Sequence, residues 1–227
     1  KKIKRTCPAC RRFFRAVAHT RLECARVKRL TRQRKTKEPC PICRLHRERC
    51  ICAQIPRLDL RTRVTLIVHA KELKRTTNTG RLALHALPNS CLVVRGEGRE
   101  RTDLSGLLTD DYQTLLLYPG EDSIDLCEFT FGSKPIQLLV PDGNWRQAGK
   151  VPIRHPELAS VPRVKISLLH NPAAPRMRRE PVEGGMSTLE AIAYAIMQFE
   201  GEAAGQSLLA LYQAKLHATL KGRPQPF

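Results

Sequence analysis

The amino-acid sequence predicts an α/β domain with a mainly parallel sheet, preceded by a small cysteine-rich element and a basic N-terminal arm. Two observations predict the domain: short apolar runs recur after Pro56, and segments with helical patterns separate them. Runs that are apolar at every position are typical of strands buried on both faces of a parallel sheet. The expected strands are 64–69, 91–95, 114–118, 136–140 and 164–169, and the expected helices between them include 79–87 and 145–150.

The C-terminal third of the chain is expected to be helical. Ser187 or Thr188, followed by Glu190, is a typical capping signal at the start of a helix. Apolar residues then keep helical spacing for several turns. Two glycines, Gly201 and Gly205, are expected to interrupt this pattern before a final helix with apolar positions Leu208, Leu211, Tyr212, Leu216 and Leu220.

The first 38 residues form the basic arm. They contain fifteen lysines and arginines but only two acidic residues, and so carry +13 of the net charge of +19. A basic arm on a less charged body is typical of a nucleic-acid-binding protein, whose affinity depends steeply on salt. A solvated tail that only improves solubility is the alternative.

Two absences in the sequence bear on the location of the protein. No apolar run reaches the roughly 18 residues that a membrane-spanning helix needs. The N-terminus also lacks the apolar stretch of a signal peptide. We therefore expect a cytoplasmic protein that does not bind a membrane.

Four cysteines follow the arm at short spacing. They give the pattern C-x2-C-x6-C-x-C, with Cys40, Cys43, Cys50 and Cys52 as its members. In a cytosolic protein, such pairs favour a metal over disulfides, and four thiolates complete the tetrahedral shell that zinc prefers. We predict a structural zinc element at 39–56, with reduced thiols in a surface turn as the alternative. The sequence leaves open a second metal site in the arm, formed by Cys7, Cys10, His19 and Cys24.

Chemically functional side chains gather in three loops that follow predicted strands. In open α/β sheets, ligands bind beyond the carboxyl ends of the strands, so these loops form the candidate site. The sequence has neither a P-loop nor a G-x-G-x-x-G motif, which argues against ordinary nucleotide hydrolysis and Rossmann dinucleotide binding. Asp142 is the central candidate, and a helix cap before Trp145 is the alternative for it. The three loops are 117–122, 140–145 and 169–188.

Several segments carry recognisable motifs in a fixed order. Besides the four-cysteine run, they are Asn78-Thr79-Gly80-Arg81-Leu82, Tyr118-Pro119 with Glu121 and Asp122, Asp142-Gly143-Asn144-Trp145 with Ala148 and Lys150, and Arg176-Met177-Arg178 before Ser187-Thr188-Leu189-Glu190-Ala191. Together they resemble the DTW-domain family of tRNA-uridine aminocarboxypropyltransferases. The resemblance covers residues 39–211 and leaves the arm outside. Asn144 departs from the family pattern, which has Thr there.

The resemblance implies a SPOUT-like, knotted catalytic domain at 57–227, with the zinc element 39–56 and the arm 1–38 in front of it. It also implies transfer of the 3-amino-3-carboxypropyl group of S-adenosylmethionine, rather than its methyl group, to N3 of a tRNA uridine. The products are acp3U and methylthioadenosine. Bacterial members of the family modify the variable loop, and eukaryotic relatives modify the D-loop. The implied partner is tRNA, and a monomer is favoured over an oligomer.

The resemblance also suggests roles for individual residues. The sulfonium is a good leaving group, so the rate must come from alignment and from a nucleophilic N3. Asp142 is the candidate to accept the N3 proton or to orient the reactants, and Trp145 either stacks on a base or simply packs. The expected donor pocket comprises Leu117, Tyr118, Pro119, Gly120, Asp142, Ser187, Thr188 and Leu189, and the expected substrate-binding residues are Asn78, Arg81, Arg176 and Arg178.

Two other classes of function remain as alternatives. A SPOUT-type RNA methyltransferase or the related rRNA aminocarboxypropyltransferase is the alternative enzyme. A methyltransferase would release S-adenosylhomocysteine in place of methylthioadenosine. A non-catalytic, zinc-stabilised RNA-binding protein would bind tRNA in a salt-sensitive manner without any dependence on S-adenosylmethionine.

Overall fold

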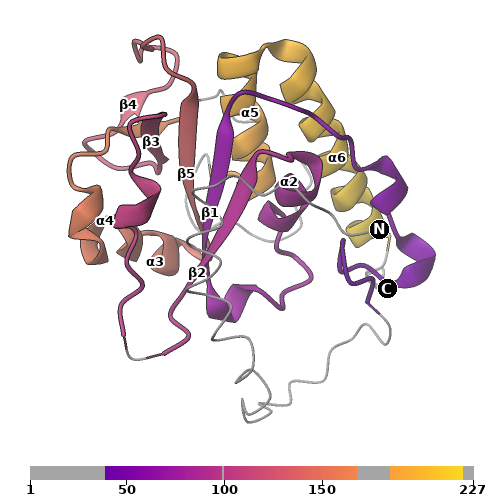
Figure 1. Cartoon of the computed structure of the whole chain (residues 1–227). Coiled ribbons are helices and arrows are strands. Elements are labelled where there is room, and N and C mark those ends of the chain that lie inside the picture. Colours follow the sequence, from indigo (N-terminus) through magenta and orange to yellow (C-terminus); the bar gives the residue numbers. More distant parts are fainter. Residues whose placement is uncertain (1–38, 99, 168–184, 222–227) are drawn as a thin grey trace.

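The computed structural model of the chain describes residues 39–98, 100–167 and 185–221 (Figure 1). A six-stranded sheet, parallel at every pairing, forms its centre and confirms the predicted α/β class. Its strands are β1 (Arg63–His69), β2 (Ser90–Arg95), β3 (Gln113–Leu117), β4 (Ile124–Asp125), β5 (Ile136–Asp142) and β6 (Arg163–Lys165). The α-helices are α2 (Gly80–Ala86), α3 (Trp145–Ala148), α4 (Lys150–Arg154), α5 (Thr188–Glu200) and α6 (Glu202–Leu220). Short 3-10 helices are η3 (Arg47–Arg49), η4 (Cys52–Gln54), η5 (Ala70–Glu72), η6 (Ser105–Leu107) and η7 (Pro156–Leu158).

The strand order places the predicted site loops beside one another. It runs β2-β1-β5-β3-β6-β4, so β5 is central and pairs with β1 on one side and with β3 on the other. Every residue of β5 is buried, which explains its apolar sequence. Because all strands are parallel, the predicted site loops that follow β3 and β5 share the carboxyl edge of the sheet.

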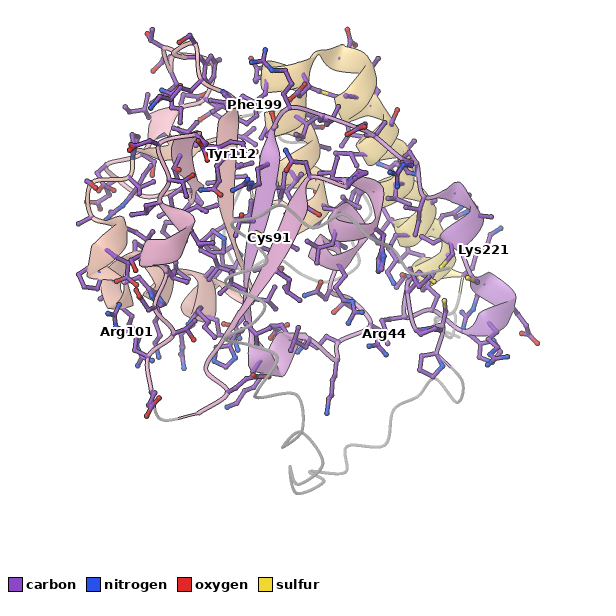
Figure 2. The ribbon with its side chains drawn as sticks, in the orientation of Figure 1. Arg44, Cys91, Arg101, Tyr112, Phe199 and Lys221 are labelled. Atoms are coloured by element: carbon purple, nitrogen blue, oxygen red, sulfur yellow. The ribbon has the colours of Figure 1, made fainter. Side chains whose placement is uncertain are left out.

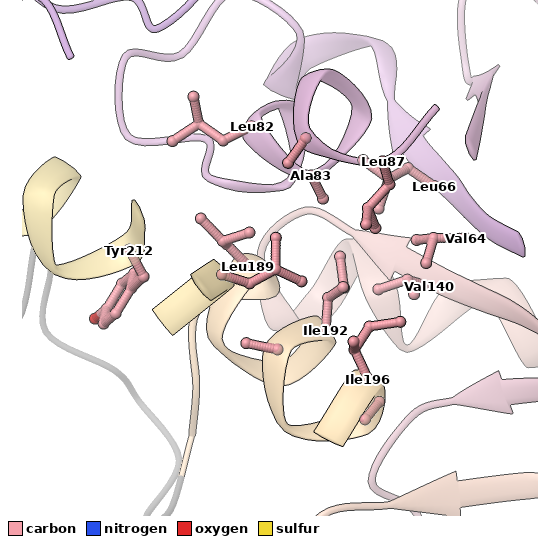
Figure 3. Packing of buried hydrophobic residues seen from close by; sticks show 14 of the residues in the cluster. Val64, Leu66, Leu82, Ala83, Leu87, Val140, Leu189, Ile192, Ile196 and Tyr212 are labelled. Carbon is pink, nitrogen blue, oxygen red and sulfur yellow. The ribbon is translucent and has the colours of Figure 1, made fainter. Parts of the chain in front are cut away.

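Helices cover both faces of the sheet and give the molecule three layers (Figure 1). On one face, α2, α5 and α6 enclose the larger apolar core. Figure 3 shows Ile192 and Ile196 of α5 facing Val140 of β5 in this core. On the other face, α4, η6 and η7 enclose a smaller core that contains Ile67 and Leu139. Within the described ranges, no helix is both long and apolar enough to cross a membrane.

The observed elements agree with the predicted positions, with a few exceptions at the ends. The predicted strand 164–169 forms only as β6, although residues 168 and 169 lie outside the described ranges. The predicted helix 145–150 is two short helices, α3 and α4, which meet at Gly149. Strand β4 was not expected, because a two-residue strand carries no periodic pattern.

The expectation that Gly205 interrupts the final helix is wrong. Gly201 ends α5 as predicted, with a φ of 95° in the left-handed region that favours glycine. Helix α6 then begins at Glu202 and continues through Gly205. A Cβ at Gly205 would lie 2.1 Å from Met197 Cγ and 2.6 Å from the Ala193 carbonyl oxygen. The missing side chain therefore allows α6 to pack closely against α5, and it does not break the helix.

Candidate functional site

Asp142 lies at the carboxyl end of the central strand β5 and is only 4% exposed. Both of its carboxylate oxygens accept hydrogen bonds. Asn78 Nδ2 donates to Oδ2 over 2.5 Å, and Thr188 Oγ1 donates to Oδ1 over 2.6 Å. A buried carboxylate requires such donors, because it has lost its contact with water. These three side chains, called the carboxylate clamp from here on, join the end of β5 to the loop before α2 and to the start of α5.

The loop before α2 fixes the amide of Asn78 in place. Asn78 Oδ1 accepts a hydrogen bond from Arg81 N over 3.2 Å, so the opposite side of the amide faces Asp142. The Arg81 side chain is half-buried, and its Nη1 donates to the Leu73 carbonyl oxygen over 3.0 Å. Burial lowers the pKa of Arg81. Both residues predicted to bind substrate in this segment are thus held by contacts within the protein.

Gly80 permits the close approach of α2 to the carboxylate clamp. A Cβ at this position would lie 3.1 Å from Asp142 Oδ2 and 3.1 Å from Thr188 Cγ2. The neighbouring hydroxyl, Thr79 Oγ1, accepts a hydrogen bond from Leu189 N over 3.2 Å. The start of α2 and the start of α5 are therefore in direct contact at the clamp.

The start of α5 has the predicted capping signal, and the structure assigns the cap to Ser187. Ser187 Oγ accepts a hydrogen bond from Glu190 N over 3.3 Å, and Glu190 Oε2 accepts one from Ser187 N over 3.2 Å. This reciprocal arrangement is a capping box. Because Ser187 is the cap, the hydroxyl of Thr188 points to Asp142 instead.

The start of α3 has a capping box as well, and its cap is Asn144. Asn144 Oδ1 accepts a hydrogen bond from Gln147 N, and Gln147 Oε1 accepts one from Asn144 N, each over 2.9 Å. Asp142 is therefore not the helix cap that the sequence offered as an alternative. Trp145 is the first residue of α3 and is half-buried.

The loop after β3 makes a tight turn beside β6. Ser123 Oγ donates to the Tyr118 carbonyl oxygen over 2.7 Å and accepts from Gly120 N over 2.9 Å. A Cβ at Gly149 would lie 2.8 Å from the Tyr118 hydroxyl oxygen, so the tyrosine ring reaches the junction of α3 and α4. Leu117 is buried and Pro119 is exposed. The residues predicted to form the donor pocket thus lie on both faces of the sheet: Leu117 packs in the larger core and Tyr118 against the smaller one.

The four predicted zinc ligands form a compact cluster. Their Sγ atoms all lie within 4.8 Å of one another, and Figure 2 shows sulfur atoms gathered beside the C-terminal end of α6, where Lys221 is labelled. Zn–S bonds of about 2.3 Å in a tetrahedron place the sulfur atoms about 3.8 Å apart. The cluster therefore fits a tetrahedral zinc ion. The Sγ–Sγ distances are 3.5 Å for Cys40–Cys52, 3.6 Å for Cys40–Cys50 and 3.8 Å for Cys43–Cys50.

The chain around Cys40 folds into a knuckle that favours a thiolate. Cys40 N donates to the Leu45 carbonyl oxygen over 2.7 Å, and Arg44 adopts the left-handed conformation with a φ of 60°. Burial raises the pKa of the Cys40 thiol, but hydrogen bonds from the backbone of Cys43 and Ile42 and from the thiols of Cys52 and Cys50 outweigh burial and lower the pKa to about 6. Burial raises the pKa of Cys43 and of Cys52, so Cys40 loses its proton more easily than either of these two thiols.

Lys215 connects the cysteine cluster to α6. Its side chain is completely buried, and its Nζ donates a hydrogen bond to the Cys43 carbonyl oxygen. Burial lowers the pKa of Lys215 to about 8, against the opposing effect of the thiolates. Cys40 and Cys43 also belong to the same apolar core as Leu211 of α6. The cysteine element is therefore packed into the rest of the protein.

Several predicted site residues cannot be placed relative to these groups. Arg176 and Arg178 lie outside the described residues, as does the whole arm 1–38. The second metal site considered for the arm, with Cys7, Cys10, His19 and Cys24, also falls there.

A comparison with protein families decides the identity of this fold. The sequence model of the DTW domain matches residues 37–220, which is most of the chain. The chain belongs to the DTW domain family. The match includes the four-cysteine cluster, the carboxylate clamp and both capping boxes. No solved structure matches the chain.

This DTW domain is similar to three proteins named tRNA-uridine aminocarboxypropyltransferase 2. The Drosophila melanogaster protein is 32% identical over 158 residues, covering 66% of this chain and 62% of the relative. The Macaca fascicularis protein is 28% identical over 178 residues, covering 73% of this chain and 58% of the relative. The Mus musculus protein is 29% identical over 171 residues, covering 71% and 56%. The chain thus spans about three fifths of the length of these curated relatives.

The sequence interpretation of this DTW domain missed Lys215. Lys215 follows Leu211 by four residues and Tyr212 by three, so it shares their apolar helix face. A cation on an apolar helix face, in a chain with a predicted four-thiolate site, could have indicated that Lys215 is buried near the cysteines. The sequence could not have identified Cys43 as its partner, because the contact joins residues 172 positions apart.

Proposed function

We propose that this DTW domain transfers the 3-amino-3-carboxypropyl group of S-adenosylmethionine to N3 of a tRNA uridine. The observation that carries the proposal is the meeting of three motif segments, 78–82, 142–145 and 187–191, at the carboxylate of Asp142. Such a meeting at the carboxyl edge of a parallel sheet is typical of a ligand site. The names of the three relatives support the same reaction.

The proposed reaction is a displacement at the carbon of the 3-amino-3-carboxypropyl group that is bonded to the sulfonium sulfur. N3 of the uridine gives its proton to solvent water and forms the new bond to this carbon. The bond between carbon and sulfur breaks, and its electron pair returns to sulfur, which leaves neutral methylthioadenosine. The sulfonium needs no acid to leave. The protein must therefore align the two substrates and stabilise the charges on them.

We assign Asp142 the role of an orienting carboxylate. Hydrogen bonds from Asn78 and Thr188 hold its two oxygens in fixed positions, so its negative charge is preorganised. A fixed negative charge attracts the sulfonium and the ammonium group of the donor. We assign Trp145, half-buried at the first position of α3, to stacking on a base of the RNA.

We propose a donor pocket along the edge formed by the ends of β3 and β5 and the start of α5. The tight turn at Tyr118 and the capping box at Ser187 give this edge a rigid backbone. The donor-binding residues proposed are Leu117, Tyr118, Pro119, Gly120, Asp142, Ser187, Thr188 and Leu189. The substrate-binding residues proposed are Asn78, Arg81, Arg176 and Arg178, and the three arginines bind a tRNA phosphate or the carboxylate of the donor.

The remaining parts of the chain have supporting roles in this proposal. The arm 1–38, with its net charge of +13, binds tRNA phosphates. The element 39–56 holds a structural zinc ion through Cys40, Cys43, Cys50 and Cys52, and the catalytic domain covers 57–227. We also propose that this domain has a SPOUT-like knot, as the family resemblance implies. Helix α5 packs against β5, whereas β6, the strand before it in the sequence, lies on the far side of β3.

Mass spectrometry of tRNA nucleosides, after incubation of the full chain with tRNA and S-adenosylmethionine, tests the proposal. We expect acp3U together with methylthioadenosine. The variant Asp142→Ala should bind tRNA like the wild type and form no acp3U, whereas the exposed control Asp110→Ala should react normally. Normal turnover by Asp142→Ala removes Asp142 from the mechanism. Release of S-adenosylhomocysteine indicates methyl transfer, and salt-sensitive binding without any product indicates an RNA-binding protein.

A further inference from the structure

Basic side chains gather at the carboxyl ends of β1 and β2. His69 ends β1, Arg95 ends β2, and the two residues are direct neighbours in the parallel register. A Cβ at Gly96 would lie 3.1 Å from His69 Nε2, so the imidazole covers the turn that follows Arg95. The group, called the basic cluster from here on, consists of His69 of β1, Lys71 of η5, Arg95 of β2, and Lys150 and Arg154 of α4.

The pleat of the sheet separates the basic cluster from the carboxylate clamp. Residues two apart on a strand share a face. Asp142 shares its face with Val140, which packs under α2 and α5. His69 shares the opposite face with Ile67, which packs in the core of α4. The carboxyl edge of the sheet therefore presents an anionic clamp on one face and a cationic cluster on the other.

The basic cluster has no acidic partner within the part of the chain that the structure describes. Lys71, Lys150 and Arg154 are exposed, and no carboxylate of the described residues forms a salt bridge with them or with Arg95. Arg95 is 5% exposed and donates through Nη2 to the Gln147 carbonyl oxygen of α3. Among the described residues, none accepts a hydrogen bond from its buried Nε. A bound anion would supply the negative charge that the exposed cations of the cluster lack.

The titration of the basic cluster agrees with this arrangement. Burial is the main cause of the lowered pKa of His69 and of Arg95, and the charge of Arg154 lowers the pKa of Arg95 further. The charges that add to burial at His69 come from Arg95, Lys71, Lys150 and Arg154. Like charges held this close repel one another, and an anion among them relieves the repulsion.

We propose that the basic cluster binds backbone phosphates of the RNA substrate and positions the strand whose uridine reaches Asp142. The proposal rests on the proposed function for the identity of the polyanion. Arginine presents several N–H donors that match the oxygens of a phosphate, and lysine adds a point charge. The exposed cations belong to two elements, η5 and α4, so a polyanion with successive phosphates fits them better than one small anion.

The exposed members Lys71 and Arg154 allow a test that leaves the buried Arg95 intact. The double variant Lys71→Gln/Arg154→Gln should bind tRNA more weakly. The slope of log affinity against log salt should become shallower by about one unit for each phosphate that the variant no longer binds. The matched control Arg57→Gln/Arg61→Gln removes two exposed charges before the opposite end of β1 and should keep the slope. Calorimetry should give the same affinity for S-adenosylmethionine in both variants and in the wild type.

The outcomes separate this proposal from the proposed function. An unchanged slope in Lys71→Gln/Arg154→Gln, or an equal change in the control, overturns the phosphate site. A loss of affinity for S-adenosylmethionine with an unchanged tRNA slope also overturns it, because the cluster then binds the carboxylate of the donor. If the wild type forms no acp3U but its slope still depends on the cluster, the proposed function fails and the phosphate site stands.

Discussion

Thr188 Oγ1 donates a hydrogen bond to Asp142 Oδ1 over 2.6 Å and joins the start of α5 to the end of β5. This contact links residues 46 positions apart at the point where three motif segments meet. It positions Asp142, a carboxylate that is buried, lies at the end of a strand and belongs to one of the motif segments. The hydroxyl of Thr188 is therefore expected to matter for activity as well as for folding.

Removal of the Thr188 hydroxyl should lower both the activity and the stability of the protein. Thr188→Ala deletes a hydrogen bond to a buried carboxylate, which costs on the order of 1.5–3 kcal/mol in the free energy of unfolding. The rate of acp3U formation should fall by at least tenfold, because Asp142 loses a hydrogen bond that positions its carboxylate. Thr188→Ser keeps the hydroxyl and should retain most of the activity. Equal activity in the alanine and serine variants would show that the contact is dispensable.

Gly80 offers a separate test of the carboxylate clamp. In Gly80→Ala, the new Cβ would lie 3.1 Å from Asp142 Oδ2, from Leu66 Cδ1 and from Thr188 Cγ2, so several groups must shift by a few tenths of an ångström. We expect a lower turnover with a small change in melting temperature, since alanine favours the helix. The control Gly98→Ala places its Cβ in open space and should leave both quantities unchanged. Wild-type turnover in Gly80→Ala would mean that the clamp tolerates movement.

Local patterns in the sequence were sufficient to predict five of the six described strands and to place Asp142 at the end of one of them. The strand β5 is apolar at nearly every position, and its buried place between β1 and β3 explains why. The family resemblance placed Asp142 and Thr188 in one pocket. Their hydrogen bond and the one from Asn78 were beyond prediction, because they depend on how distant segments pack. The same reason hid the basic cluster, whose members come from four elements. The prediction for Gly205 was wrong, because the sequence alone does not distinguish a glycine that allows two helices to pack closely from one that ends a helix.

Lys215 should stabilise the metal-bound form of the cysteine cluster. Four thiolates around Zn²⁺ leave a net charge of −2, and a buried ammonium group beside them offsets part of it. Lys215→Met keeps the volume and removes the charge, so zinc affinity should fall about tenfold, or about 1.4 kcal/mol. Competition with a chromogenic chelator measures the change, with one zinc ion expected at this cluster in the wild type. The control Lys221→Met removes an exposed charge at the end of α6 and should keep the affinity, and equal losses would contradict the role of Lys215.

Glu157 should contribute a part of the stability that disappears in acid. Burial acts to raise the pKa of its carboxyl, but hydrogen bonds from Leu104 N, Arg101 and His155 outweigh burial and lower the pKa from 4.5 to about 2. A lowered pKa stabilises the folded state above the unfolded-state value, and this contribution is lost as the pH falls from about 4.5 to about 2. At neutral pH it is on the order of 1–2 kcal/mol, because one pKa unit corresponds to about 1.4 kcal/mol and solvent around the half-exposed Arg101 screens part of the effect.

Denaturant unfolding of Glu157→Gln and of the wild type across this pH range checks the expectation. The difference in unfolding free energy between the two proteins should be large at pH 7 and should shrink steadily below pH 4.5. The control Glu97→Gln changes an exposed carboxylate and should follow the wild type at every pH. A difference that stays constant down to pH 2 would assign the effect of Glu157→Gln to packing or to neutral hydrogen bonds. Such a result would leave the charge of Glu157 without a role in stability.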